Sequence, residues 1–155
     1  MWRKLIVIAS ASLSTVLLLS SCEDKVTQCQ QLIQVVNAGN SLIDQNKGEQ
    51  VITSWQLSQD LQVMTTSLKE LNLSDPKLKE FKRGFAIIFD DLSQAIAKAS
   101  QGLGAAKNTQ PSTEGREKLQ EARMQIDTSL TSAENAGKKF DTLATELNQY
   151  CGQSQ

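Results

Sequence analysis

The side chains best suited to chemistry in this sequence are three cysteines, because the chain contains no histidine. The commonest general base near neutral pH and the commonest transition-metal ligand are therefore both missing. Asp90 and Asp91 come closest to a catalytic carboxylate pair, but neighbours on a helix point about 100° apart and do not converge on one substrate. We expect no catalysis, no metal site and no cofactor.

The charge balance gives no reason to expect a nucleic-acid partner. The chain has 16 basic and 17 acidic residues, for a net charge of −1, and nucleic-acid-binding domains carry an excess of basic residues. Gly102-Leu103-Gly104 begins like a dinucleotide-binding loop, but no predicted strand precedes it and Lys107 stands where the third glycine would be. The end of a helix is the favoured interpretation of these glycines.

The N-terminal residues have the order of a secretory signal peptide. Arg3 and Lys4 precede an uncharged apolar run over residues 5–19. This run of about 15 residues is shorter than the roughly 20 needed for a permanent membrane span. The run ends in Leu19-Ser20-Ser21-Cys22, which resembles the lipobox of bacterial lipoproteins.

The resemblance covers residues 1–22 and implies processing and anchoring, not an activity. In bacterial lipoproteins the chain is cut just before the cysteine, whose thiol carries the lipid. Residues 1–21 would then be the signal peptide and residues 22–28 the lipid anchor and tether. The mature protein would lie on the exported side of the cytoplasmic membrane, with membrane lipid as its partner through acylated Cys22.

The two remaining cysteines are predicted to form a disulfide. If Cys22 is acylated, Cys29 and Cys151 remain as an even pair in a compartment where disulfides persist. A redox-active pair normally has the close spacing C-x-x-C, which these two lack. The bridge would tie together the two ends of a helical bundle over residues 29–151, leaving 152–155 as a tail.

Apolar residues recur every three or four positions in four segments, which predicts four helices. The first runs from Asp24 to about Asn46, and the second from Glu49 to about Leu73 with the most regular stripe. The third starts at Asp75-Pro76, a preferred cap followed by proline at the first helical position. We expect it to close at Gly102 and Gly104.

The polar residues 104–115 are predicted to form the longest loop, with Ser112 or Thr113 starting the last helix. The apolar stripe of the third helix includes Leu103, and that of the fourth runs through Leu119, Ile126 and Leu130 to Cys151. We expect all of these residues to face the core. Small residues in the fourth stripe would let a neighbouring helix approach closely.

These segments predict an all-α fold, an antiparallel up-down-up-down four-helix bundle closed by the disulfide between its first and last helices. Cys29 and Cys151 both fall on apolar helix faces, and in such a bundle they lie at the same end. The alternative is a three-helix bundle with the first segment as an ordered arm.

Four apolar residues lie away from the predicted core faces and are candidates for contact with a protein partner: Ile52, Trp55, Val63 and Ile87. We therefore expect a membrane-anchored binding or assembly module rather than an enzyme. The alternative function is a small-ligand carrier with an apolar cavity between its helices.

Overall fold

The computed structural model describes residues 19–46 and 51–152, with side chains described from Lys25 to Asn46 and from Ser54 to Gly152. This part of the chain forms four helices and contains no strand. They are α1 (Leu19–Gln45), α2 (Val51–Glu70), α3 (Pro76–Lys107) and α4 (Thr113–Gly152). The predicted all-α class and the four-helix bundle are confirmed.

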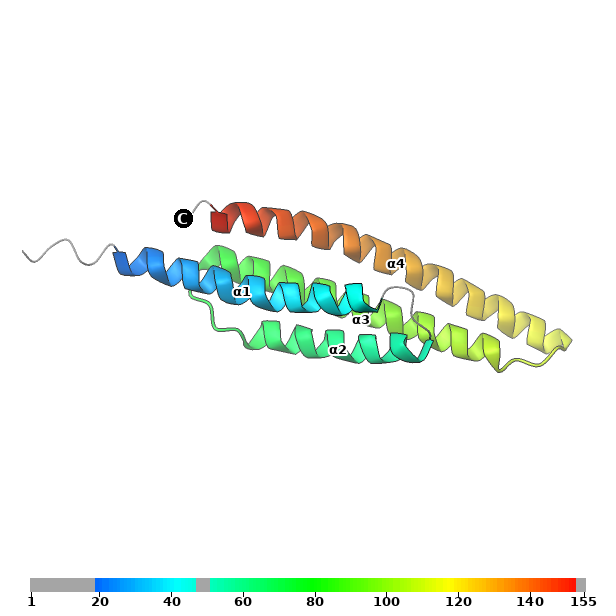
Figure 1. Cartoon of the computed structure of the whole chain (residues 1–155). Helices are drawn as coiled ribbons and strands as arrows, with labels where there is room; N and C mark the ends of the chain where they lie inside the picture. The colour runs from blue at the N-terminus through cyan, green and yellow to red at the C-terminus, as the bar shows by residue number, and fades with distance from the viewer. Residues whose placement is uncertain (1–18, 47–50, 153–155) are drawn as a thin grey trace, which may run out of the picture.

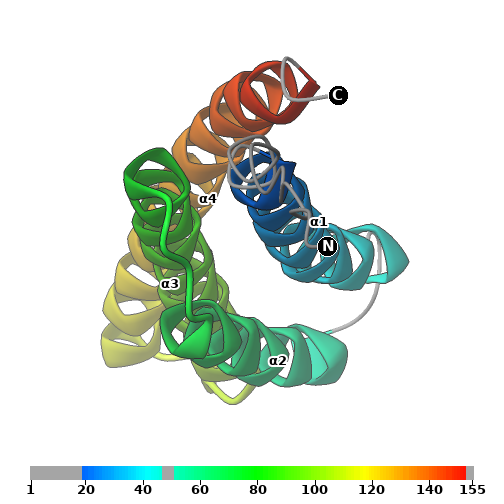
Figure 2. The same cartoon turned by 90° about the vertical axis from the view of Figure 1, so that its left-hand side faces the viewer.

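The four helices alternate in direction, and α3 is the central element (Figure 1). It packs along both α2 and α4, whereas α1 lies against α2 and α3. The helices therefore follow an arc in the end view, with α1 meeting α4 at the end of the bundle where the C-terminus lies (Figure 2). The predicted alternative, a three-helix bundle with an arm, is wrong because α1 contributes buried residues to the common core.

The core is built from apolar side chains of all four helices. Phe85 and Phe89 are fully buried, and Phe140 of α4 packs against both rings, with centroids 5.5 Å and 5.9 Å away. The Phe89 ring occupies the space beside Gly39, so α1 approaches α3 closely at a residue that has no side chain. The most deeply buried aliphatic residues are Leu32, Leu61, Leu68, Leu78 and Leu147.

The start of α3 is confirmed and its predicted end is wrong. Asp75 is the N-cap, and its carboxylate accepts a hydrogen bond from the Leu78 N–H at 2.9 Å. Gly102 does not end the helix, which continues to Lys107, so that only residues 108–112 connect it to α4. A side chain at Gly102 would meet Ile126 and the Ala122 carbonyl, and the glycine therefore permits close helix packing instead of a turn.

The two later helices are longer than the two earlier ones, with 32 and 40 residues against 27 and 20. They consequently project beyond α1 and α2 as a two-helix hairpin (Figure 1). Leu103, Leu119 and Leu130 lie on this hairpin and are exposed. The prediction that they face the core is wrong, because α1 and α2 are too short to cover them.

No helix in the described ranges has an apolar stretch long enough to cross a bilayer.

Candidate functional site: the disulfide end and the exposed apolar residues

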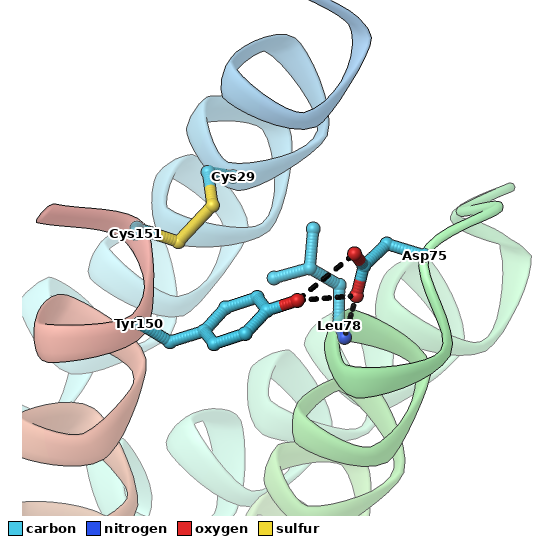
Figure 3. Close-up of a disulfide and its surroundings, with 5 residues drawn as sticks. All are labelled: Cys29, Asp75, Leu78, Tyr150 and Cys151. Carbon is cyan, nitrogen blue, oxygen red and sulfur yellow. Dashed lines mark hydrogen bonds between the residues drawn. A yellow bond between two sulfur atoms is a disulfide. The ribbon is translucent and has the colours of Figure 1, made fainter. Parts of the chain in front are cut away.

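The predicted bridge between Cys29 of α1 and Cys151 of α4 is confirmed (Figure 3). The S–S distance is 2.07 Å and the Cα atoms are 5.8 Å apart, within the usual range for a disulfide. The bridge links positions 122 residues apart. Because α1 and α4 contact each other little elsewhere, the disulfide is their principal connection.

Cys22 belongs to α1, but its side chain lies outside the described residues. Its position on the helix places it seven residues before Cys29, about 10 Å along the axis. The segment 22–28 is part of α1, and the helix therefore leads directly from Cys22 to the disulfide. Lipidation at Cys22 stays a prediction.

A polar network surrounds the disulfide on the side of α3. The Tyr150 hydroxyl, next to Cys151 in the sequence, donates to both carboxylate oxygens of Asp75, at 3.1 Å and 2.9 Å (Figure 3). Burial raises the pKa of the Asp75 carboxyl, but the hydrogen bonds from the Leu78 N–H and the Tyr150 hydroxyl outweigh it and hold the pKa below its ordinary value. Asp75 thus acts as helix cap and as link between α3 and α4.

The same network extends to α1 through Gln28. Its side-chain oxygen accepts from the backbone N–H groups of Ser74 and Asp75, at 2.6 Å and 3.0 Å, and its amide donates to the Ser74 hydroxyl at 2.8 Å. Lys25 lies over the Tyr150 ring, 3.8 Å from its centroid. Nothing in the sequence marks Gln28 or Tyr150 for these roles, because contacts between residues so far apart in the chain leave no local pattern.

Three of the four predicted partner-binding residues are exposed, and the structure does not gather them into one patch. Trp55 is 46% exposed, while Val63 and Ile87 are 58% and 60% exposed. Trp55 and Val63 lie on α2, whereas Ile87 lies on α3 in a groove that neither of them lines. The side chain of Ile52 lies outside the described residues.

The groove at Ile87 runs between α2 and α3, has a volume of about 320 Å³ and is rimmed by charged residues. Lys82 on its rim donates to the Leu71 carbonyl at 3.0 Å and so helps to satisfy the C-terminal end of α2. Its lining residues are Lys69, Lys82, Arg83, Ala86, Ile87 and Asp90. The floor of the groove is apolar, and its edges carry three basic side chains and one carboxylate.

Asp90 and Asp91 diverge, as expected for helix neighbours. Asp90 lines the groove beside α2 and accepts from the Gln94 amide at 2.8 Å. Asp91 lines a separate, polar groove of about 370 Å³ between α3 and α4. The two carboxylates therefore do not share a site.

Within the described ranges, no group of three or more Cys, Asp or Glu side chains could hold a metal ion. No protein-family model matches this chain, and no curated protein or solved structure is significantly similar to it. The disulfide end and the exposed apolar side chains are therefore what the molecule itself offers as guides to function.

Proposed function

We propose that this protein is a lipid-anchored binding or assembly module at a membrane surface on the exported side of a bacterial cytoplasmic membrane, without catalytic activity. Its anchor is the acylated thiol of Cys22, and its partner is a protein that contacts exposed apolar residues such as Trp55. The observation that carries the proposal is the disulfide between Cys29 and Cys151.

The disulfide supports export, because such bonds persist in oxidising compartments and are rare in the bacterial cytosol. It also uses two of the three cysteines, which leaves Cys22 as the remaining thiol. Two or three acyl chains on this thiol would hold the protein firmly, since one chain alone gives only marginal binding. The lipobox-like residues before Cys22 support the same assignment.

The position of the disulfide indicates how an anchor at Cys22 would orient the bundle relative to the membrane. Cys22 precedes the bridge by seven residues on the same helix, so an anchor there would hold the bundle by its disulfide end. The hairpin of α3 and α4 lies at the opposite end of the molecule (Figure 1). An anchored molecule would therefore present the hairpin and the sides of α2 and α3 to a partner.

The binding module is favoured over the alternative of a small-ligand carrier. The cavity between α1 and α4 measures only about 60 Å³, less than the 300 Å³ or so of a typical ligand site. The larger grooves at Ile87 and Asp91 lie on the outside of the bundle. A carrier of apolar molecules needs an enclosed apolar space, and the side chains of Phe85 and Phe89 fill the centre.

The anchor is tested by the intact mass of the full chain after expression in a bacterium and extraction from its membranes. We expect a mature chain that begins at Cys22 and carries acyl groups. In a Cys22→Ser variant the leader should remain and lipid label should be lost. A double Cys29→Ser and Cys151→Ser variant is the control and should keep the lipid. An intact leader with a free Cys22 thiol in the normal protein would overturn the proposal.

The partner is tested by native mass spectrometry of the gently extracted protein and by cross-linking in its own membrane. We expect a bound protein and no small-molecule adduct. Trp55→Ala should reduce the cross-link several-fold, because aromatic side chains dominate contact energies. A retained small adduct would support the carrier instead.

A further inference from the structure

The strongest unassigned feature of the molecule is the exposed side of the projecting hairpin that continues the core. Leu119, Ile126 and Leu130 follow one another at steps of seven and four, and so lie on one side of α4. This side continues into the core, where Phe140 and Leu147 pack. Together with Leu103 of α3, these residues form what we call the tip face: Leu103, Leu119, Ile126 and Leu130.

The length of the tip face follows from the ends of the two shorter helices. Gln45, where α1 ends, lies 16 residues after Cys29, and the residue 16 positions before Cys151 is Asn135. On the other side, the Ser93 hydroxyl bonds to Ser58, so the start of α2 lies level with about residue 100 of α3. On the α1 side, the uncovered stretch of α4 thus spans residues 113–135, about 33 Å. On the α2 side it ends earlier, near Ile126, because Gly102 of α3 meets Ile126 of α4.

Charged residues flank the tip face in two oppositely charged sets. Arg116 and Arg123 stand three residues before and four residues after Leu119. Asp127 and Glu134 stand at the same spacings around Leu130. Residues three or four apart share a helix side, so each leucine lies beside two charges of one sign, basic near the hairpin tip and acidic nearer the bundle.

We propose that the tip face binds the tip face of a second copy of this chain, with the two α4 helices antiparallel about a twofold axis near residues 124–125. Leu119 of each copy then lies opposite Leu130 of the other. The same register places Arg123 opposite Asp127 and Arg116 opposite Glu134 across the interface. A parallel pairing would instead place the two basic sets at one level of the interface and the two acidic sets at another, so that opposite charges could not pair.

Independent features of the chain give the same centre. The midpoint of the stretch of α4 that α1 leaves uncovered is residue 124. The change from basic to acidic flanking residues falls between Arg123 and Asp127. The α4 helix of a second copy can therefore lie along this stretch of α4, on the side that α1 leaves open. At the tip, the two hairpins then form a four-helix arrangement with two helices from each copy. At the other end of each copy, α1 and α2 complete the same arrangement with α3 and α4 of their own chain.

The flanking charges remain available for this pairing. Arg123 Nε lies 3.9 Å from Asp127 within its own helix, and Glu134 is 2.7 Å from Lys138. The side chains of these two ion pairs are all at least 66% exposed. Exposed pairs of this kind contribute little to the stability of the fold. They can therefore add partners across the interface without a large loss.

The test measures the mass of the full chain by sedimentation equilibrium in a density-matched detergent, with empty micelles in excess so that chains do not share one by chance. We expect a dimer of the normal protein. Leu130→Glu should yield a monomer. Met124→Glu is the matched control, because Met124 is similarly exposed, at 62% against 58%, but lies off the apolar side of α4; it should remain a dimer.

Charge reversal provides the decisive comparison. An acidic variant with Arg116→Glu and Arg123→Glu, and a basic variant with Asp127→Lys and Glu134→Lys, should each be monomeric when alone. Mixed in equal amounts they should form a heterodimer. Circular dichroism checks that each variant keeps its helices. A monomeric normal protein, dimers of either variant alone, or no heterodimer on mixing would each overturn the proposal, as would a different protein cross-linked at Leu119 and Leu130.

Discussion

The two ends of this molecule are stabilised in different ways. At the disulfide end, three helices are connected by the Cys29–Cys151 bond and by the hydrogen bonds of Gln28, Asp75 and Tyr150. At the hairpin end, α3 and α4 pack only against each other among the described helices, and apolar side chains that continue the core are exposed. One end of the bundle is thus held by covalent and polar links between helices, whereas the other end leaves the continuation of its core uncovered by α1 and α2.

The packing of the hairpin explains how two helices remain together without a large core. Gly115, Ala122, Ser129 and Ala136 are buried and recur at every seventh position of α4. The three residues after Gly115 in this series let α3 approach closely, and Gly102 of α3 meets α4 in the same way, whereas Gly115 lies against Gln110 of the connecting segment. Close backbone contact between α3 and α4 stabilises the hairpin. The larger apolar side chains of the hairpin lie on the side that α1 and α2 do not cover.

Loss of the disulfide should have the largest effect on stability. In the chain-entropy model, opening a loop of this length costs about 5 kcal/mol. Replacing Cys29 and Cys151 together with alanine avoids an unpaired thiol, and urea unfolding monitored by circular dichroism measures the change. If the double variant lost less than about 1 kcal/mol, the disulfide would not be the principal link between α1 and α4.

A side chain at Gly39 should have the next largest effect, because it would collide with the Phe89 ring in the core. We expect Gly39→Ala to lower the free energy of unfolding by about 1–3 kcal/mol. Gly137→Ala is the matched control in α4, where an added Cβ meets nothing within 4 Å; it should stabilise the protein by about 0.5–1 kcal/mol through higher helix propensity. Equal effects at both positions would contradict the close approach of α1 to α3.

The cap at Asp75 should make the disulfide end sensitive to acid. Its pKa is lowered in the folded protein, so the ionised carboxylate stabilises the fold above the ordinary pKa of aspartate, and this stabilisation is lost as the pH falls through the folded value. Asp75→Ala should cost about 1 kcal/mol at pH 7. The difference from the normal protein should shrink as the pH falls below the ordinary pKa of aspartate.

Urea unfolding of both proteins across this pH range measures the effect. Asp75→Asn, which can still cap the helix, should reduce the pH dependence while keeping much of the stability. A pH-independent difference between Asp75→Ala and the normal protein would show that the charge of the carboxylate is not what matters.

The periodicity of apolar residues predicted the four helices, and the count of cysteines together with the apolar faces on which two of them fall predicted the disulfide. Cys29 and Cys151 lie on such faces at the same end, and the structure joins them. Periodicity does not indicate how much of an apolar helix face is covered by neighbouring helices. Leu103, Leu119 and Leu130 continue the core stripes but are exposed, because coverage depends on the lengths of α1 and α2.

The contacts of the candidate site were harder to predict than the helices. Trp55, Val63 and Ile87 are exposed, as expected for residues off the apolar stripes, but their separation depends on the packing of α2 against α3. Gln28 looks like an ordinary polar helix residue in the sequence, although it bonds to the backbone of Ser74 and Asp75. Only the assembled bundle brings these positions together.

The two neighbouring glycines of α3 provide the smallest expected effects and the most direct test of the hairpin. Gly104 has open space around it, so Gly104→Ala should stabilise the protein by about 0.5–1 kcal/mol through higher helix propensity. Gly102→Ala should lose this gain, because its Cβ would lie 2.9 Å from Ile126 and 3.1 Å from the Ala122 carbonyl. Thermal unfolding of the two variants side by side measures the difference. If Gly102→Ala stabilised the protein as much as Gly104→Ala, the hairpin would not be closely packed, and the Gly102 position would be only an exposed helix residue.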